Sequence, residues 1–278
     1  MHPRIKVPSA YKKEFPGAAD FYKNFVEPRL PVIFENAAGG LEADQLKLSN
    51  LNNSGLAALS FIEVSRFVEE EKDRRSLREF SKHIHEEIYL QDNVNNNIKK
   101  FITLPRCLRC SYLTPHLVET RHVVIGRSFP LPLIQDENDL LTCLLDGKKE
   151  VILADPREYP EITRILDLDQ SSGEKGSFIN SLRVDYLKYP EAAKVGKYRV
   201  ALLGPGDCLY IPAAWIQQTN IIETVNTIEL RWENTAWKPD DECLKSIHKH
   251  APLSQFSYKG RKIFIINSIV YNLGFQWK

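Results

Sequence analysis

The chain has 278 residues and a formal net charge of +1, with 43% hydrophobic and 26% charged residues. These values are ordinary for a soluble globular protein with a large core, and the near-zero charge argues against a dominant electrostatic attraction to nucleic acid or an anionic membrane. No apolar run is long enough for a transmembrane helix, and the N-terminus lacks the apolar region of a secretory signal. We therefore expect an intracellular protein, nuclear or cytoplasmic.

The first part of the chain mixes helices and strands. Hydrophobic spacing predicts helices over residues 18–29 and 76–87, and strands over 31–35, 57–64 and 118–125. Ser76 and Glu79 have the spacing of a capping box, which supports the start of the second helix. The asparagine-rich stretch 93–97 predicts a turn or a flexible loop.

The stretch 129–156 is the part around which we expect the rest of the chain to be arranged. Residues 139–145 are almost entirely apolar, as in a strand that is buried on both faces. Asp146-Gly147 is a hairpin-turn signal, because glycine accepts the positive φ angle that such turns need. Residues 150–154 then predict the returning strand of a β-hairpin.

A second stretch, residues 203–218, predicts a turn, a short strand and a tight corner. The turn is Gly-Pro-Gly-Asp at 204–207, the strand covers 208–211 and the corner covers 212–215. A further strand is expected just before this stretch, at 198–203.

The five cysteines are odd in number, and their spacing is not that of a disulfide framework. Cys143 and Cys208 fall on predicted core strands, where we expect them to be buried small hydrophobic residues. Cys107-x-x-Cys110 has no second pair downstream. A structural zinc site would need two more ligands, so we expect ordinary thiols there instead.

Together the two stretches contain a strand, Gly-Lys-Lys at 147–149, a second strand, and the motif GPGDxLYIPxxW at 204–215. This pattern resembles the JmjC/cupin-like family of iron- and 2-oxoglutarate-dependent oxygenases, in the branch of small hydroxylases that includes factor-inhibiting-HIF and the tRNA wybutosine hydroxylase. The resemblance implies a mainly β fold with flanking helices, built as a double-stranded β-helix or jelly roll. The barrel and its N-terminal elements would cover residues 1–238, and a helical segment would cover 239–278.

The metal-binding positions of that family are altered in this chain. The family holds Fe(II) with a His-x-Asp/Glu pair and a distal His, which leave open positions for 2-oxoglutarate and oxygen. By the resemblance these positions fall on Ile134, Asp136 and Gln217. Isoleucine has no donor atom, and a glutamine carbonyl suits Ca²⁺ or Mg²⁺ better than catalytic iron. The resemblance therefore implies that Fe(II) and 2-oxoglutarate are lost as cofactors, and that the chain has no catalytic or metal-binding residue.

The cosubstrate positions are also mixed. Lys149 stands where the family pairs a lysine with the distal carboxylate of 2-oxoglutarate. Leu131, Leu140 and Glu229 stand where the family has a hydroxyl residue and two asparagines. Lys149 is thus either a remnant that still receives an acid, with less specificity, or a solvated lysine in a hairpin.

Residues 225–232 predict the last core strand, with Glu229 and Arg231 on one face and apolar side chains on the other. In a relative that face lines the barrel lumen. A lumen that holds Glu229, Arg231, Asp136 and Lys149 would need to pair its charges. We therefore predict at least one ion pair across it, in the place of the missing metal.

The function expected from these features is that of a catalytically inactive pseudoenzyme, which acts as a protein-binding scaffold or adaptor. Two alternatives stay open: a working hydroxylase of protein or tRNA with misaligned ligands, and a non-catalytic RNA-binding module, for which the neutral charge gives weak support. The apolar spacing at 259–275 predicts a C-terminal helix. That helix would either form a homodimer contact or pack on the chain's own barrel.

Overall fold

A computed structural model describes most of the first 233 residues and a short later segment. The described ranges are 4–51, 61–66, 72–84, 88–94, 96–110, 113, 116–126, 128, 130–168, 175–177, 184–233 and 252–255. Within them, no helix is long and apolar enough to cross a membrane. The expected helices of the tail at 239–278 lie outside the described residues except for 252–255, so the division at residue 238 stays a prediction.

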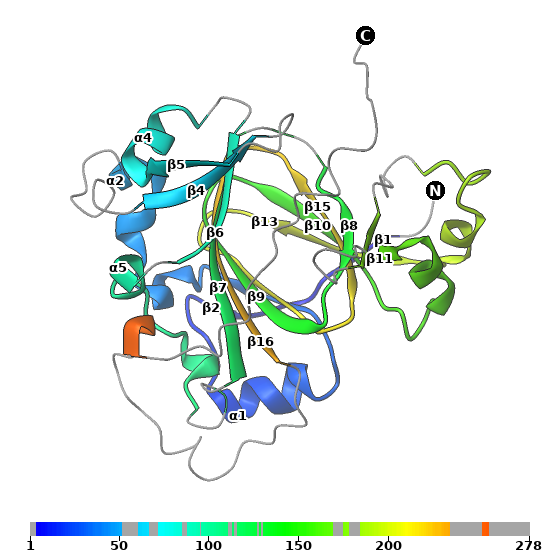
Figure 1. Ribbon diagram of the computed structural model, residues 1–278. Helices are drawn as coiled ribbons and strands as arrows, with labels where there is room; N and C mark the ends of the chain where they lie inside the picture. The colour runs from blue at the N-terminus through cyan, green and yellow to red at the C-terminus, as the bar shows by residue number, and fades with distance from the viewer. Residues whose placement is uncertain are drawn as a thin grey trace.

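Two mixed β-sheets form the body of the molecule (Figure 1). The first has the strand order β1 (Arg4–Lys6), β13 (Tyr198–Leu203), β10 (Lys149–Ala154), β15 (Ile216–Ile221), β8 (Leu133–Gln135), β12 (Lys175–Ser177) and β11 (Asp167–Leu168). The second has the order β2 (Ser9–Lys12), β3 (Val32–Glu35), β14 (Cys208–Ile211), β9 (Asn138–Asp146), β16 (Val225–Glu233), β7 (Leu117–Ile125), β6 (Ile88–Asn93), β4 (Phe61–Arg66) and β5 (Lys72–Ser76). The predicted mainly β jelly roll is confirmed.

The sheets enclose one apolar core and cover two others. Between them lie side chains such as Leu140, Leu144, Val151, Leu209 and Trp215. The outer face of the nine-stranded sheet packs against the N-terminal helices, and the outer face of the seven-stranded sheet packs against the segment between β10 and β13. Because side chains on a strand alternate between faces, each central strand contributes to two of these cores.

The helices are short, and most flank the barrel. They are α1 (Ala18–Phe21), the π-helix η1 (Tyr22–Val26), α2 (Leu48–Leu51), α4 (Leu77–Lys82), α5 (Asn96–Lys99) and the 3₁₀ helices η2 (Ala38–Leu41), η3 (Asp44–Leu46), η4 (Arg106–Leu108), η6 (Pro160–Ile165), η7 (Pro190–Lys194) and η8 (Leu253–Gln255). The capping box of Ser76 and Glu79 is confirmed, although α4 ends at Lys82 rather than at 87. The turn expected at 93–97 is wrong in part, because α5 begins at Asn96.

The predicted hairpin between residues 139 and 154 is wrong. Strand β9 pairs with β14 and β16, whereas β10 pairs with β13 and β15 in the other sheet. The turn at Asp146-Gly147 therefore passes the chain from one sheet to the other. Gly147 has φ +85°, and a Cβ atom there would lie 1.8 Å from the carbonyl oxygen of Thr224. The turn still requires glycine, but for a crossover rather than a hairpin.

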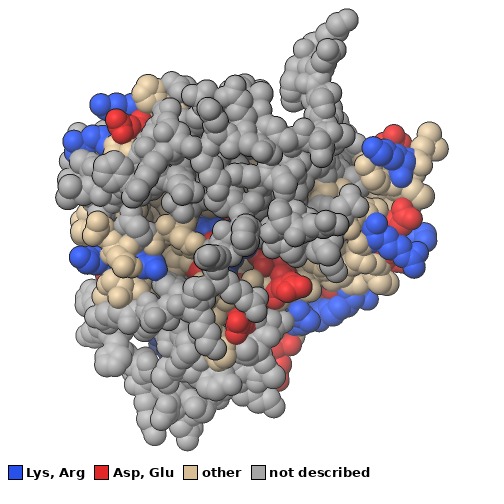
Figure 2. Space-filling model, in the orientation of Figure 1, with Lys and Arg blue, Asp and Glu red and all other residues tan. Residues whose placement is uncertain are grey.

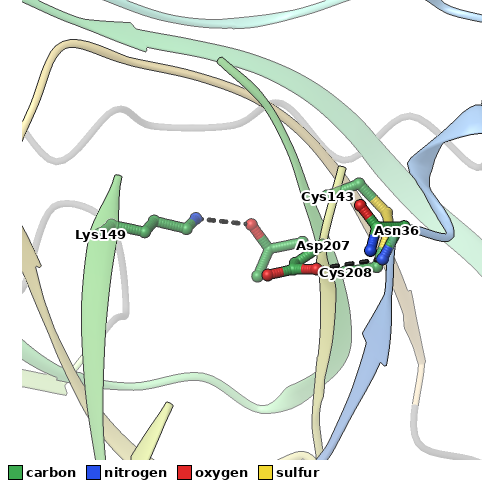
Figure 3. Close-up of a disulfide and its surroundings, with 6 residues drawn as sticks. Asn36, Cys143, Lys149, Asp207 and Cys208 are labelled. Carbon is green, nitrogen blue, oxygen red and sulfur yellow. Dashed lines mark hydrogen bonds between the residues drawn. A yellow bond between two sulfur atoms is a disulfide. The ribbon is translucent and has the colours of Figure 1, made fainter. Parts of the chain in front are cut away.

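The cysteine predictions need two corrections. Cys143 and Cys208 are buried as expected, but they form a disulfide rather than two free thiols (Figure 3). Cys110 is also disulfide-bonded, so Cys107-x-x-Cys110 is not a pair of ordinary thiols. Cys107 is free and buried. Spacing along the chain could not show this, because β9 and β14 come together only through sheet pairing.

Candidate functional site in the barrel lumen

The fold brings the three altered metal positions together. Ile134 on β8 and Gln217 on β15 are directly opposite each other in the sheet. Their neighbours Leu133 and Ile216 belong to the outer core, so Ile134 and Gln217 face the other sheet. Asp136 follows β8 at the same end of the lumen.

Asp136 is held in this place by its own backbone and side chain. Its carbonyl oxygen accepts a hydrogen bond from the N–H of Ala214 at 2.6 Å, which ties it to the corner at 212–215. Its Oδ1 accepts from the backbone N–H of Asn138 at 2.9 Å. Asp136 therefore closes a local turn at the start of β9 while its other oxygen points to Arg231.

The predicted ion pair is confirmed. Arg231 Nη1 lies 2.7 Å from Oδ2 of Asp136, and Arg231 Nη2 lies 3.9 Å from Oε2 of Glu229. The side chain of Arg231 is only 5% exposed. The buried guanidinium of Arg231 thus places a permanent positive charge beside Asp136. Of the three positions that correspond to the family's metal ligands, Asp136 is the one that retains a carboxylate.

A second buried ion pair lies beside the first. Glu119 and Arg121 on β7 form a short contact, and both are almost fully buried. In the sheet register Arg121 lies opposite Glu229, and Glu119 lies opposite Arg231. Sequence reasoning missed this pair, although the period-two pattern of the strand at 118–125 could have placed both residues on one face.

Lys149 is buried and hydrogen-bonded, so it is not a solvated lysine in a hairpin. It is 5% exposed, and its Nζ donates to Thr142 Oγ1 at 2.8 Å (Figure 3). Burial lowers the pKa of Lys149 to about 8, against the opposing attraction of Glu229. Two of the other cosubstrate positions are apolar, since Leu140 lies in the core between the sheets and Leu131 packs against it, whereas the third, Glu229, lies near Arg231.

The residues at the metal positions do not fit the Fe(II) site that the resemblance implies. Ile134 offers no ligand atom, Gln217 offers only an amide, and the carboxylate of Asp136 already faces a guanidinium. Across the described ranges, no three His, Cys, Asp or Glu side chains are grouped so that they could hold a metal ion.

Asp139, at the start of β9, was not singled out from sequence and anchors the corner behind the site. Its Oδ1 accepts from the hydroxyl of Tyr210 at 2.8 Å and from the N–H of Ala213 at 2.9 Å. Arg29 donates to the carbonyl of Ala213 at 2.7 Å. Burial raises the pKa of Asp139 to about 6, although both hydrogen bonds favour the carboxylate.

Comparison with known proteins agrees with the fold of the two sheets. Residues 18–228, more than half of the chain, match the family model described as a cupin-like domain. The chain belongs to this cupin-like family.

Two curated proteins are similar to this cupin-like chain. Jumonji C domain-containing protein 5 of Drosophila melanogaster is 28% identical over 141 residues, which are 49% of this chain and 33% of that protein. The tRNA wybutosine-synthesizing protein 5 of Danio rerio is 28% identical over 99 residues, which are 36% of this chain and 28% of that protein. The matched stretches thus span a third or less of these relatives.

Proposed function

We propose that this cupin-like domain is a pseudoenzyme, which does not use Fe(II) or 2-oxoglutarate and acts by binding a protein partner as a scaffold or adaptor. The observation that carries the proposal is the Arg231–Asp136 ion pair at 2.7 Å, beside the facing residues Ile134 and Gln217. A metal ion bound to Asp136 would have to displace this guanidinium, and Ile134 and Gln217 would offer it no imidazole at the two positions where the family has histidines.

The charge balance of the lumen supports the same proposal. Among the described lumen residues that are buried or half-buried, three acids face three bases, namely Glu119, Asp136 and Glu229 against Arg121, Lys149 and Arg231. A dication together with a dicarboxylate would enter a site whose charges are already compensated within the protein.

A working hydroxylase would need imidazole ligands from elsewhere in the chain. The sequence has no histidine between His122 and His248. His122 lies on the outer face of its sheet, where its Nε2 contacts Asn226 Oδ1 at 2.7 Å. This histidine therefore cannot reach Asp136 without a change of strand face.

The near-zero net charge of +1 supports a protein partner over a nucleic acid. On the face shown in Figure 2, the Lys and Arg side chains of the described residues lie in separate groups, with Asp and Glu among them. Among the described residues of this face, the basic side chains form no continuous stripe of the kind that follows a phosphate backbone. A homodimer through the C-terminal helices stays a prediction.

Metal binding and succinate formation test directly whether the domain uses Fe(II) and 2-oxoglutarate. The purified chain should bind neither Fe(II) nor Co(II) stoichiometrically and should form no succinate from 2-oxoglutarate. A restored variant, Ile134→His with Gln217→His and Arg231→Gln, supplies two imidazoles and frees Asp136, and it should gain Co(II) binding visible in its absorption spectrum. Arg231→Gln alone is the matched control and should not bind. Stoichiometric iron in the unaltered protein, or its production of succinate, overturns the proposal.

Recovery from native extract tests the binding role. A protein partner should remain bound after nuclease treatment and should be identified by cross-linking. Complexes that disappear on nuclease treatment, with a steep salt dependence, would instead indicate an RNA-binding module.

A further inference from the structure

The disulfide between Cys143 and Cys208 (Figure 3) joins two neighbouring inner strands of the nine-stranded sheet, on its outer face. The two residues are directly opposite each other on β9 and β14, and Phe34 on β3 is the next partner across the sheet. They are 1% and 0% exposed, in the core that the N-terminal helices cover. The bond joins positions 65 residues apart in the chain.

We infer that this disulfide forms while the chain folds, and that the domain therefore matures in an oxidising compartment rather than in the nucleus or cytoplasm. The inference rests on burial. Once Phe21 and the rest of the N-terminal layer cover the outer face, neither an oxidant nor a reductant reaches the two sulfur atoms without local opening. The redox state of the compartment in which the chain folds therefore decides whether the pair is joined.

The other cysteines support a structural role for the disulfides. Cys110 is disulfide-bonded, but its near neighbour Cys107 is a free thiol. A redox-active Cys-x-x-Cys motif would exchange between these two residues. Cys107 is also fully buried, and burial raises the pKa of its thiol, which makes it a poor nucleophile. The chain thus carries two separate cross-links and no exposed exchange centre among its described cysteines.

Formation of the bond requires a partner that accepts two electrons, and we assign this role to a disulfide-bearing oxidoreductase of the compartment. The thiolate of one cysteine attacks the partner's disulfide, forms a mixed disulfide and releases one partner thiolate. The thiolate of the second cysteine then attacks the mixed disulfide and releases the other partner thiolate. Cys143 and Cys208 lose two protons and two electrons in total, and the partner becomes a dithiol.

The test is the thiol state of the full natural protein, taken from its own cells. Acid quenching followed by alkylation in denaturant blocks every free thiol, and proteolysis without reductant keeps existing disulfides. We expect a linked peptide pair that contains Cys143 and Cys208, and alkylated Cys107 in the same sample as an internal control. Alkylated Cys143 and Cys208 in most of the protein, next to alkylated Cys107, would overturn the inference.

A second measurement compares how the unaltered chain folds under reducing and under oxidising conditions. The unaltered chain is produced in the reducing and in the oxidising compartment of one host, and the soluble folded yield is compared. We expect a yield several-fold higher from the oxidising compartment, with the linked peptide present only there. Equal yields, with both thiols free in the folded protein, would show that the bond is not part of maturation.

Discussion

Arg231 is the single side chain on which the charge balance of the lumen depends most directly. Its side chain is buried and lies near two carboxylates, those of Asp136 and Glu229. A buried cation is tolerated when opposite charges compensate for its lost hydration. Loss of Arg231 leaves two nearby carboxylates without this cation, whereas loss of Asp136 still leaves Glu229 beside Arg231.

A double-mutant cycle measures this coupling. We expect Arg231→Met to lower the free energy of unfolding by about 3 kcal/mol, because breaking a buried ion pair leaves uncompensated charge. Asp136→Asn keeps the acceptor for Asn138 and should cost less. Urea unfolding of the two single variants and the double variant should give a coupling of about 1–3 kcal/mol. Strictly additive effects would contradict an energetic role for the pair.

Individual residues of the site differ in how far their roles could be predicted from the sequence. The shared face of Glu229 and Arg231 could be predicted, because side chains alternate along a strand. The role of Asp139 could not, because its partners Tyr210 and Ala213 are 71 and 74 residues away. A carboxylate at the start of a strand looks the same in sequence whether it faces solvent or anchors a distant corner.

At the scale of elements, the turn after β9 decides how the two sheets are connected. Its local signal, Asp146-Gly147, indicates a reversal of the chain but carries no information on which strand comes next to β9. The pairing of β9 with β14 and β16 follows from long-range burial instead. The carbonyl of Lys148 accepts from the N–H groups of Ile222 and Glu223, so the turn also holds the loop before β16.

Replacement of Gly147 by alanine tests this role. The positive φ angle and the 1.8 Å approach of a Cβ to Thr224 both oppose a side chain, and the obstacle is backbone that cannot rotate away. We expect a loss of more than about 3 kcal/mol in urea unfolding. Gly39→Ala is the matched control, since nothing lies within 4 Å of its Cβ position, and it should change stability by less than about 0.5 kcal/mol. Equal effects at both positions would show that the turn accepts a side chain.

The disulfide between β9 and β14 gives a second prediction at this scale. Closing a loop of 65 residues restricts the unfolded chain, which corresponds to about 4 kcal/mol in the loop-entropy treatment. Urea unfolding of the unaltered protein should therefore shift by about that amount between oxidised and fully reduced samples. Cys143→Ala/Cys208→Ala is the control, because its stability should not respond to reduction of this bond. A similar response to reductant in the variant would assign the effect to Cys110.

For the whole molecule, the family resemblance carried by the motifs at 147–149 and 204–215 was enough to predict the jelly roll. Local sequence patterns placed most of the central strands. The short strand β8 and the strand β15 were not expected as elements, although they carry Ile134 and Gln217. Their sequences are short or polar, and they are strands because neighbours on both sides complete their hydrogen bonding. The residues at the site were thus predictable from the family resemblance, but the two strands that carry Ile134 and Gln217 were not.

Two buried groups on the outer face of the nine-stranded sheet should give the whole molecule opposing responses to pH. Asn226 donates to the carbonyl of Leu46 and to Asp146, so its Oδ1 is the acceptor and His122 carries its proton on Nε2. Burial lowers the pKa of His122 to about 4 and raises that of Asp139 to about 6. The folded state therefore binds the His122 proton more weakly than the unfolded chain does, and the Asp139 proton more strongly.

The signs of the two contributions follow from this difference in proton binding. As pH rises from about 4 to 6.5, His122 makes the folded state more stable, because the unfolded chain holds more protons there. Across about pH 4 to 6, Asp139 makes the folded state less stable, because the folded chain holds more. Each contribution is on the order of 3 kcal/mol, and the two partly cancel in the unaltered protein.

A variant that lacks one of these two groups should reveal how the other group changes stability with pH. Asp139→Asn keeps an acceptor for Tyr210 and Ala213, and its stability should rise more steeply with pH than that of the unaltered protein. His122→Gln keeps a donor for Asn226, and its stability should fall relative to the unaltered protein over the same range. Urea unfolding at several pH values between about 4 and 6.5 measures both slopes. If both variants run parallel to the unaltered protein, neither group titrates differently on folding, and the two burial effects on pKa are refuted.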